Sequence, residues 1–379
     1  MNILMNVNLF LSAGASSRTG GINVSTVINV CIGLIVFGFI IFFHELGHFL
    51  IAKKNGIGVI EFAVGMGPVL FSFTKNETKY SLRLIPMGGF CMMLGEDEEV
   101  EDEHSFSKKT VWQRLAVVLA GPIFNFILAF ILSIILIGVC GYDKPVVEEF
   151  AEVSAAKDAG VMEGDIITGY NGHRIYNYRE ILVYNQLNNS GADITLQIDR
   201  AGEVKEYTFT PILDESSGAY LMGIRGGSRQ RKDAWNVIKY SFLEMRYQVK
   251  TVYLSLKYLI TGKLGLKNVS GPVGIVSMMN DTINEAKDSA GDNTSLAVIN
   301  VILNMINFSI LISANLGVMN LLPIPALDGG RALMLLVEGI FRKRLSVQKE
   351  AFINALGFML LIGLMVVVLF QDIFKIMIK

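Results

Sequence analysis

The chain has 379 residues, of which 52% are hydrophobic and 18% are charged, and its mean hydropathy is +0.47. The apolar residues occur in long blocks, so the composition predicts a membrane protein rather than a soluble domain. A formal net charge of −1 gives no support for nucleic-acid binding. Three cysteines without a C-x-x-C pair exclude a disulfide framework and a cysteine-rich zinc site.

The first 51 residues contain a short N-terminal extension and then the first predicted membrane span. Residues 1–25 lack a basic n-region and a strong apolar core, so we interpret them as an extension rather than a signal peptide. Residues 27–43 carry one polar side chain, Asn29, and no charge. Together with the next eight residues they are long enough to cross a bilayer at about 1.5 Å per residue.

The end of this span reads H-E-L-G-H at residues 44–48. Residues four apart lie on one helix face, so His44 and His48 can bind the same metal ion. Glu45 is rotated by about 100° from His44, which places it beside the open coordination position, where it can take and return a proton. Ionisable groups inside a span are costly and usually functional. A buried helix whose histidines merely bond to polar neighbours is the weaker interpretation.

Residues 56–94 have the pattern of a β-hairpin. Residues 59–64 and 80–85 are strand-type, and residues 74–78 form a turn-type cluster between them. A glycine-rich hairpin directly after a metal-binding helix can hold an extended peptide by strand addition, but a simple surface hairpin fits equally well. The acidic run at residues 96–103 is expected to be a solvated loop.

The second predicted span, residues 115–139, precedes a polar module. The span contains A-G-P-I-F-N at residues 120–125, in which Pro122 is expected to bend the helix. Asn125 is a polar group that needs a partner, so we expect it to face the other spans near the site. Residues 143–227 have short alternating strands and one helix, which is typical of a compact α+β module.

The region after this module contains an amphipathic helix. Residues 232–263 carry one apolar stripe at steps of three and four, which favours a helix on the membrane surface or against the spans. A coiled-coil partner is the less favoured interpretation. Residues 264–280, with S-G-P-V-G at 270–274, are expected to interrupt regular structure, and residues 285–294 to form a polar loop.

The third and fourth predicted spans are residues 296–319 and 352–370. The third has three asparagines on one face, which must turn inward: Asn300, Asn304 and Asn307. It continues into N-L-L-P-I-P-A-L-D-G-G at residues 320–330, whose prolines end the helix near membrane depth. Irregular backbone there must be buried in protein or line a wet cavity. Asp328 is therefore a candidate third metal ligand.

The distribution of Lys and Arg predicts the orientation. These residues gather between the first two spans and again after Asp328, whereas the N-terminal tail has only Arg18. The positive-inside rule then places both basic segments in the cytoplasm, and both termini and the α+β module outside it. His48 and Asp328 consequently come to the same level of the membrane.

Three stretches together resemble the motifs of the site-2 protease family of intramembrane zinc metalloproteases, whose bacterial branch is often called the regulator-of-sigma-factor proteases. They are residues 44–48, 120–125 and 320–330, as quoted above. Residues 159–172, A-G-V-M-E-G-D-I-I-T-G-Y-N-G, look like a bacterial PDZ domain. The resemblance runs from about residue 25 to the C-terminus, and the N-terminal extension departs from the family pattern.

The resemblance implies a catalytic Zn²⁺ site. His44, His48 and Asp328 would be the three protein ligands, with water in the fourth position, and Glu45 would be the general base. Asn320 would hold the substrate backbone, and we assign Asn125 as a second candidate substrate contact. Single-span membrane proteins would be the substrates, for example anti-sigma factors or remnant signal peptides, trimmed beforehand by an upstream site-1 protease. The PDZ-like module would filter them.

We therefore predict a polytopic α-helical membrane protein with about four transmembrane helices, a membrane-associated β-hairpin and one extracytoplasmic α+β PDZ-like domain. It would reside in the bacterial cytoplasmic membrane, in contact with lipid. The predicted divisions are an N-terminal extension (1–25), the first half of the protease core (26–142), the PDZ-like domain (143–227), an amphipathic helix and linker (228–295), and the second half of the core (296–379).

Two alternatives remain at this point. A non-catalytic, PDZ-bearing membrane scaffold would keep a structural metal site or none. A structural zinc normally has four protein ligands, and the sequence offers three, which favours catalysis. A metal transporter would also place His and Asp inside the membrane, but it needs neither a Glu at this spacing nor a PDZ-like module.

Overall fold

The computed structural model describes residues 24–96, 98, 100–187, 191–214, 218–230, 233–262, 271–291, 293–343 and 346–377. The described chain divides into two compact units. One comprises residues 133–251, and the other residues 24–132 together with 252–377. The predicted N-terminal extension lies, up to residue 23, outside the described residues.

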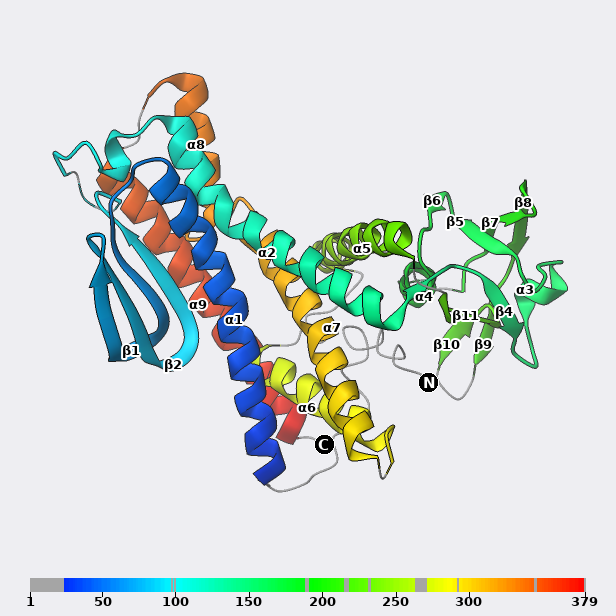
Figure 1. Cartoon of the computed structure of the whole chain (residues 1–379). Coiled ribbons are helices and arrows are strands. Elements are labelled where there is room, and N and C mark those ends of the chain that lie inside the picture. Colours follow the sequence, from blue (N-terminus) through cyan, green and yellow to red (C-terminus); the bar gives the residue numbers. More distant parts are fainter. Residues whose placement is uncertain are drawn as a thin grey trace. The chain divides into compact units, whose positions relative to one another are not determined.

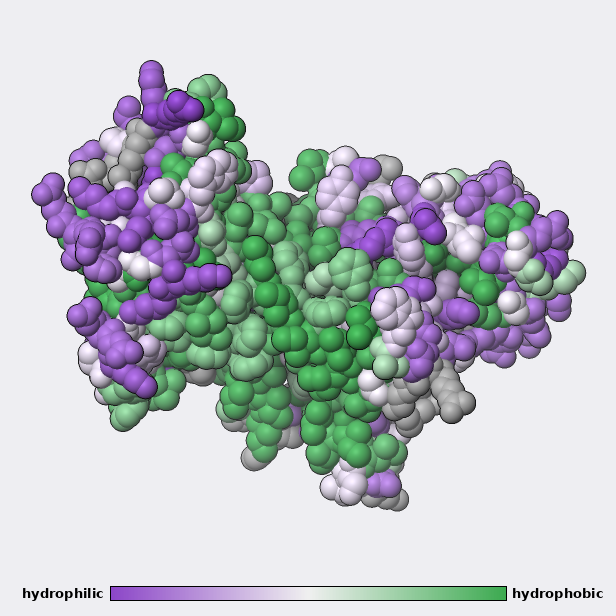
Figure 2. Space-filling model, turned by 45° about the horizontal axis from the view of Figure 1, so that its top comes forward, coloured by the Kyte–Doolittle hydropathy of each residue, from purple (hydrophilic) through white to green (hydrophobic). Residues whose placement is uncertain are grey.

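Within the described residues, four helices are long and apolar enough to cross a membrane (Figure 1). They are α1 (Val24–Lys54), α2 (Val111–Cys140), α7 (Thr294–Asn320) and α9 (Val347–Met377). All four coincide with predicted spans, and α2 continues as a helix through Pro122. Hydrophobic side chains cover these long helices, as the green surface in Figure 2 shows. The prediction of a polytopic helical membrane protein is confirmed at this level.

The predicted hairpin consists of β1 (Val59–Lys75) and β2 (Thr78–Met93), which are much longer than expected. Residues 59–64 pair with residues 79–82 on one side and with residues 89–93 on the other. The two strands therefore bend back on themselves, and residues 89–93 form an outer strand of the sheet. Gly65 and Gly88 adopt positive φ at these bends.

The distal half of the hairpin exposes large apolar side chains. Five of them are between 42% and 62% exposed: Met66, Val69, Leu70, Phe71 and Phe73. An apolar patch of this kind on a small sheet marks an interaction surface. It supports the prediction of a membrane-associated hairpin.

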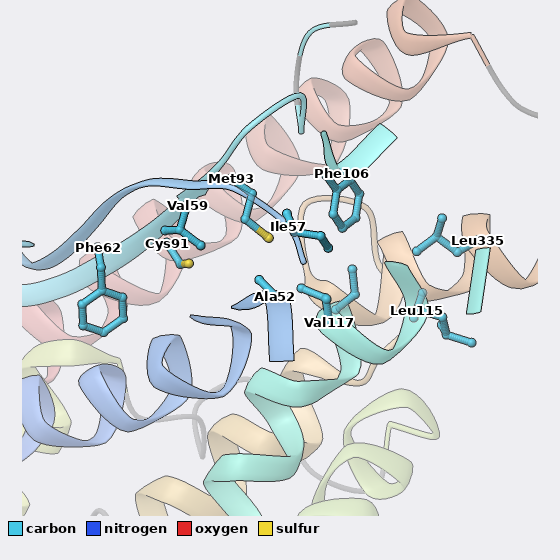
Figure 3. Close-up of a cluster of buried hydrophobic side chains, with 12 residues drawn as sticks. Ala52, Ile57, Val59, Phe62, Cys91, Met93, Phe106, Leu115, Val117 and Leu335 are labelled. Atoms are coloured by element: carbon cyan, nitrogen blue, oxygen red, sulfur yellow. The ribbon is translucent and has the colours of Figure 1, made fainter. Parts of the chain in front are cut away.

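A buried cluster joins the base of the hairpin to the helices (Figure 3). Ala52 at the end of α1, Ile57 before β1, Val117 of α2 and Leu335 of α8 (Asp328–Phe341) point toward one another. Phe106, in the short 3-10 helix Phe106–Lys108, closes the same cluster. Close packing of this kind fixes the ends of the elements that carry the site.

One expectation about the region before the third span is wrong. Residues 271–288 do not interrupt regular structure, because α6 (Pro272–Asp288) is a helix that packs against α1, α7 and α9. Pro272 stands in the first turn, where a missing N–H costs nothing. The Asp372 carboxylate accepts the N–H of Gly274 (2.9 Å), so it caps the helix. Residues 264–270 of the same prediction lie outside the described residues.

The unit of residues 133–251 is an α+β module with mainly short strands. Its four-stranded sheet has the order β6-β5-β7-β8, and three two-stranded ladders join β11 to β4, β12 to β3 and β10 to β9. The bounds are β3 (Tyr142–Asp143), β4 (Val147–Phe150), α3 (Ala155–Asp158), β5 (Ile166–Tyr170), β6 (His173–Arg174), α4 (Tyr178–Leu187), β7 (Ile194–Arg200), β8 (Glu203–Phe209), β9 (Ile212–Asp214), β10 (Ala219–Leu221), β11 (Ile224–Gly226) and β12 (Arg229–Gln230).

In this module, the edge of β11 that faces away from β4 is covered by a side chain. Tyr178, the first residue of α4, donates its hydroxyl to the carbonyl of Ile224 (3.0 Å) and is only 6% exposed. A Cβ on Gly226 or Gly227 would lie 2.7 or 2.9 Å from the Tyr178 ring. The two glycines therefore leave the space that the ring occupies along this edge.

The predicted amphipathic helix is α5 (Ala234–Ile260), which exposes large apolar side chains and buries polar ones. Trp235, Ile238 and Phe242 of the predicted apolar stripe are 74%, 51% and 55% exposed. The buried residues opposite include Glu244 and Gln248. The first part of the apolar stripe thus faces outward, as a helix on a membrane surface requires, whereas Val252 farther along the stripe is buried.

Candidate active site

The H-E-L-G-H motif lies near the C-terminal end of α1, inside a candidate span. Because His44 and His48 are one helical turn apart, their Nε2 atoms come within 3.2 Å of each other. The two residues are 6% and 8% exposed, whereas Glu45 is partly exposed beside them.

Asp328 is brought to these histidines by a tight turn. It is the first residue of α8, directly after the irregular segment 321–327. A Cβ on Gly329 would lie 2.3 Å from the carbonyl oxygen of Leu322, and a Cβ on Gly330 would lie 2.2 Å from that of Ile324. The D-G-G sequence is thus required by packing, because the turn folds directly onto the first turn of α8.

The ligand atoms of the three residues converge. Asp328 Oδ2 lies 3.1 Å from Nε2 of His44 and 3.6 Å from Nε2 of His48, and all the atoms lie within 4.8 Å of one another. Asp328 Oδ2 is buried and has no hydrogen-bond partner among the described residues, as expected of an atom reserved for a cation. Two imidazoles and one carboxylate are a common ligand set of catalytic zinc, so the residues present fit this metal.

Helix α2 supports both imidazole rings from behind. The carbonyl oxygen of Val117, which is fully buried, lies 2.8 Å from Nδ1 of His48. Nδ2 of Asn125 lies 3.0 Å from Nδ1 of His44. A Cβ on Gly121 would lie only 2.3 Å from Nε2 of His48, so this glycine leaves the space for the rings.

The remaining predicted site residues lie around the same point. Nδ2 of Asn320, the last residue of α7, is 3.4 Å from Nε2 of His44. A Cβ on Gly89, in the outer strand of the hairpin, would lie 3.3 Å from Cγ of Glu45. The structure thus brings together all six predicted site residues and the hairpin edge, and its geometry places Asn125 behind His44.

Sequence reasoning missed three contributors to the site. The roles of Val117 and Gly121 depend on how closely α1 and α2 approach, which no local pattern reports, although Gly121 lies inside the quoted A-G-P stretch. Glu96 was expected in a solvated loop, but its side chain is only 15% exposed and forms an ion pair with Arg331 of α8. This pair connects the end of the hairpin to the helix that carries Asp328.

Comparison with known proteins agrees with this geometry. Peptidase family M50 matches residues 32–364. The chain belongs to this family. The resemblance to the site-2 proteases is thereby confirmed, and the protein is a membrane zinc metalloprotease.

Its relatives match along nearly their whole length. A Clostridium acetobutylicum protein that carries the provisional name of a zinc metalloprotease is 39% identical over 91% of this chain and 97% of its own. Zinc metalloprotease RasP of Geobacillus kaustophilus is 32% identical over 93% of this chain and 99% of its own. Regulator of sigma-W protease RasP of Bacillus subtilis is 31% identical over 90% of this chain and 97% of its own.

Proposed function

We propose that this M50 peptidase hydrolyses peptide bonds within the transmembrane segments of single-span membrane proteins. The observation that carries the proposal is the convergence of Asp328 with His44 and His48, which lie inside a candidate span. A metal site at that depth has little use for a soluble substrate, whereas a membrane-embedded segment can reach it. The name of the Bacillus subtilis relative, which regulates sigma-W, suggests membrane-bound anti-sigma factors as one substrate class.

His44, His48 and Asp328 would hold the zinc ion. Bound there, it would supply Lewis-acid activation of a carbonyl oxygen and of water. The Glu45 carboxylate would accept the proton of the attacking water and return it to the amine that leaves. Asn320 would bind substrate backbone on the accessible side of His44, since its amide can donate and accept.

The outer strand of the hairpin would present the segment to be cut. A helix hides its peptide carbonyls, so the substrate must be extended before attack. Residues 89–93 pair with residues 59–64 on one side only, and Gly89 lies against Glu45. A substrate added as the next strand would therefore pass directly beside the general base.

The 143–227 module would act outside the cytoplasm as a filter for substrates that an upstream site-1 protease has trimmed. Because Tyr178 covers the edge of β11, the arrangement supports exclusion of bulky substrates over capture of a new C-terminus. The positive-inside rule supports extracytoplasmic termini and a location in the bacterial cytoplasmic membrane.

Cleavage of a single-span reporter in detergent tests the proposal. Glu45→Gln should lower the rate by at least about 10²- to 10⁴-fold, because the general base is lost. Zinc content should be unchanged, because Glu45 is not a ligand. Glu101→Gln, at a side chain that is 98% exposed, is the matched control and should cleave normally. Equal cleavage by wild type and Glu45→Gln would overturn the assignment of Glu45.

A further inference from the structure

The two zinc-binding histidines differ in what stands behind them. Each has its Nε2 facing Asp328, so each must give the Nε2 lone pair to the metal and carry its proton on Nδ1. That buried Nδ1–H group needs an acceptor. For His48 the acceptor is the carbonyl of Val117 (2.8 Å), a group that can only accept. The backbone of α2 thereby fixes the tautomer of His48.

His44 has an amide where His48 has a carbonyl. The Asn125 side-chain amide lies 3.0 Å from Nδ1 of His44, and Asn125 is completely buried. An amide can present either its oxygen or its nitrogen after a half-turn about its last bond. Only the oxygen can accept the Nδ1–H that zinc binding requires, and Oδ1 has no hydrogen-bond partner within the residues that the structure describes.

Asn125 is also held in place from its other side. Its backbone carbonyl accepts a hydrogen bond from the hydroxyl of Ser313 on α7 (2.8 Å), and Ser313 is completely buried too. The residue thus stands between α1 and α7 with no exposed surface for a substrate to contact. This argues against its assignment as a substrate contact.

We propose that Asn125 is a positioning residue whose amide oxygen accepts the Nδ1–H of His44 and so fixes the tautomer that presents Nε2 to the zinc ion. The proposal rests on the proposed zinc ligands, but not on the identity of the substrate. Helix α2 then accepts the Nδ1–H of both histidines, through a backbone carbonyl for His48 and through a side-chain amide for His44.

Two variants of similar size separate the possible roles of Asn125. Asn125→Asp keeps an acceptor and removes the donor, whereas Asn125→Leu removes both. Zinc affinity is measured by competition with a chromogenic chelator, on the full chain in detergent. Asn125→Leu should bind zinc about 10- to 100-fold more weakly, as is typical when an outer-sphere partner is lost. Asn125→Asp should bind zinc at least as tightly as wild type.

A second asparagine in a span provides the control. Asn304 of α7 bonds to the carbonyl of Asn300 in its own helix (3.0 Å), so Asn304→Leu should leave zinc affinity unchanged. Normal zinc affinity in Asn125→Leu would overturn the proposal. If the KM of this variant for the reporter is raised as well, Asn125 is a substrate contact. A tenfold loss in Asn125→Asp would overturn it independently, even if Asn125→Leu does not fold. A chelator assay reports this outcome whether or not the reporter is the right substrate.

Discussion

Each unit of the molecule buries a group of charged or metal-binding side chains, and the two groups differ in how they are satisfied. In the module, Arg179 forms ion pairs with Asp143 and Glu244 and stacks over Tyr247, so each buried carboxylate has a positively charged partner. Around Asp328 the neighbours are two imidazole nitrogens, and Asp328 Oδ2 has no hydrogen-bond partner in the described part of the chain.

The difference separates structure from chemistry. A buried group of charges whose members satisfy each other holds elements together, as Arg179 holds α4 to α5 and β3. A buried group whose electron pairs all converge on one point is incomplete without a cation. Substitutions should therefore affect stability in the module, and zinc binding and catalysis around Asp328.

The largest expected effect is at Gly121, which touches the zinc site without being a ligand. In Gly121→Ala the new Cβ would lie 2.3 Å from Nε2 of His48 and 2.7 Å from Cε1 of His44, so both rings must move. Zinc affinity should fall by at least the 10- to 100-fold typical of outer-sphere losses, and reporter cleavage should fall with it. Chelator competition and cleavage rates measure both.

Gly138 is the matched control on the same helix. A Cβ there meets no atom within 4 Å, so Gly138→Ala should keep full zinc affinity and stabilise α2 by up to about 1 kcal/mol. Equal zinc affinity in Gly121→Ala and wild type would mean that the rings have more space than the structure gives them.

The second prediction concerns stability rather than chemistry. Arg179→Met should destabilise the module by about 3–5 kcal/mol, because Asp143 and Glu244 are left buried without their partner. Burial already raises the pKa of Asp143 against the opposing effect of Arg179. Zinc content should not change. Hydrogen exchange of the module's amides in the full chain measures the loss.

An exposed ion pair in the same module provides the comparison. Arg225 and Glu149 are 66% and 61% exposed at the side chain, so Arg225→Met should cost less than about 1 kcal/mol. Arg179→Met and Arg225→Met are compared by the loss of hydrogen-exchange protection in the module. If both lose the same protection, or if Arg179→Met loses zinc, the proposed division between structural and catalytic charges is wrong.

The sequence predicted the features that are encoded locally. Uncharged blocks of about 20 residues predicted the four spans, and the spacing of His44 and His48 predicted two of the three proposed ligands. Asp328 was predicted as the third ligand because prolines end the third span shortly before it. Each of these predictions needed only neighbouring residues, together with the helical repeat or the length of helix that crosses a bilayer.

The features that sequence reasoning missed depend on tertiary contacts. The Gly-Pro at residues 271–272 was interpreted as an interruption, but Asp372, about 100 residues away, caps a helix there. The predicted hairpin strands, residues 59–64 and 80–85, stopped short of Gly65 and Gly88, because a bend and an end have the same local signal. The proximity of Asn125 to Nδ1 of His44 depends on how α1 and α2 pack, which no local pattern reports.

The smallest expected effect is a pH dependence of the module. Asp165 accepts hydrogen bonds from Nε (2.7 Å) and Nη2 (2.8 Å) of Arg200 and from the N–H of Met162 (2.8 Å). Burial opposes ionisation, but these bonds together hold the pKa of Asp165 below its ordinary value of about 3.9. A lowered pKa in the folded state stabilises the module above that ordinary value, and the gain disappears as the pH falls through the lowered pKa.

The comparison of wild type with Asp165→Asn isolates this contribution. Wild type should be the more stable of the two at pH 6, and the difference should shrink steadily below about pH 4, because a protonated Asp165 pairs with Arg200 no better than an amide does. Amide exchange of the module in the full chain, compared at each pH, measures the difference. A difference that stays constant from pH 6 to pH 3 would show that Asp165 acts through its shape and neutral hydrogen bonds, and the Arg200 pair would then be no part of the module's charge balance.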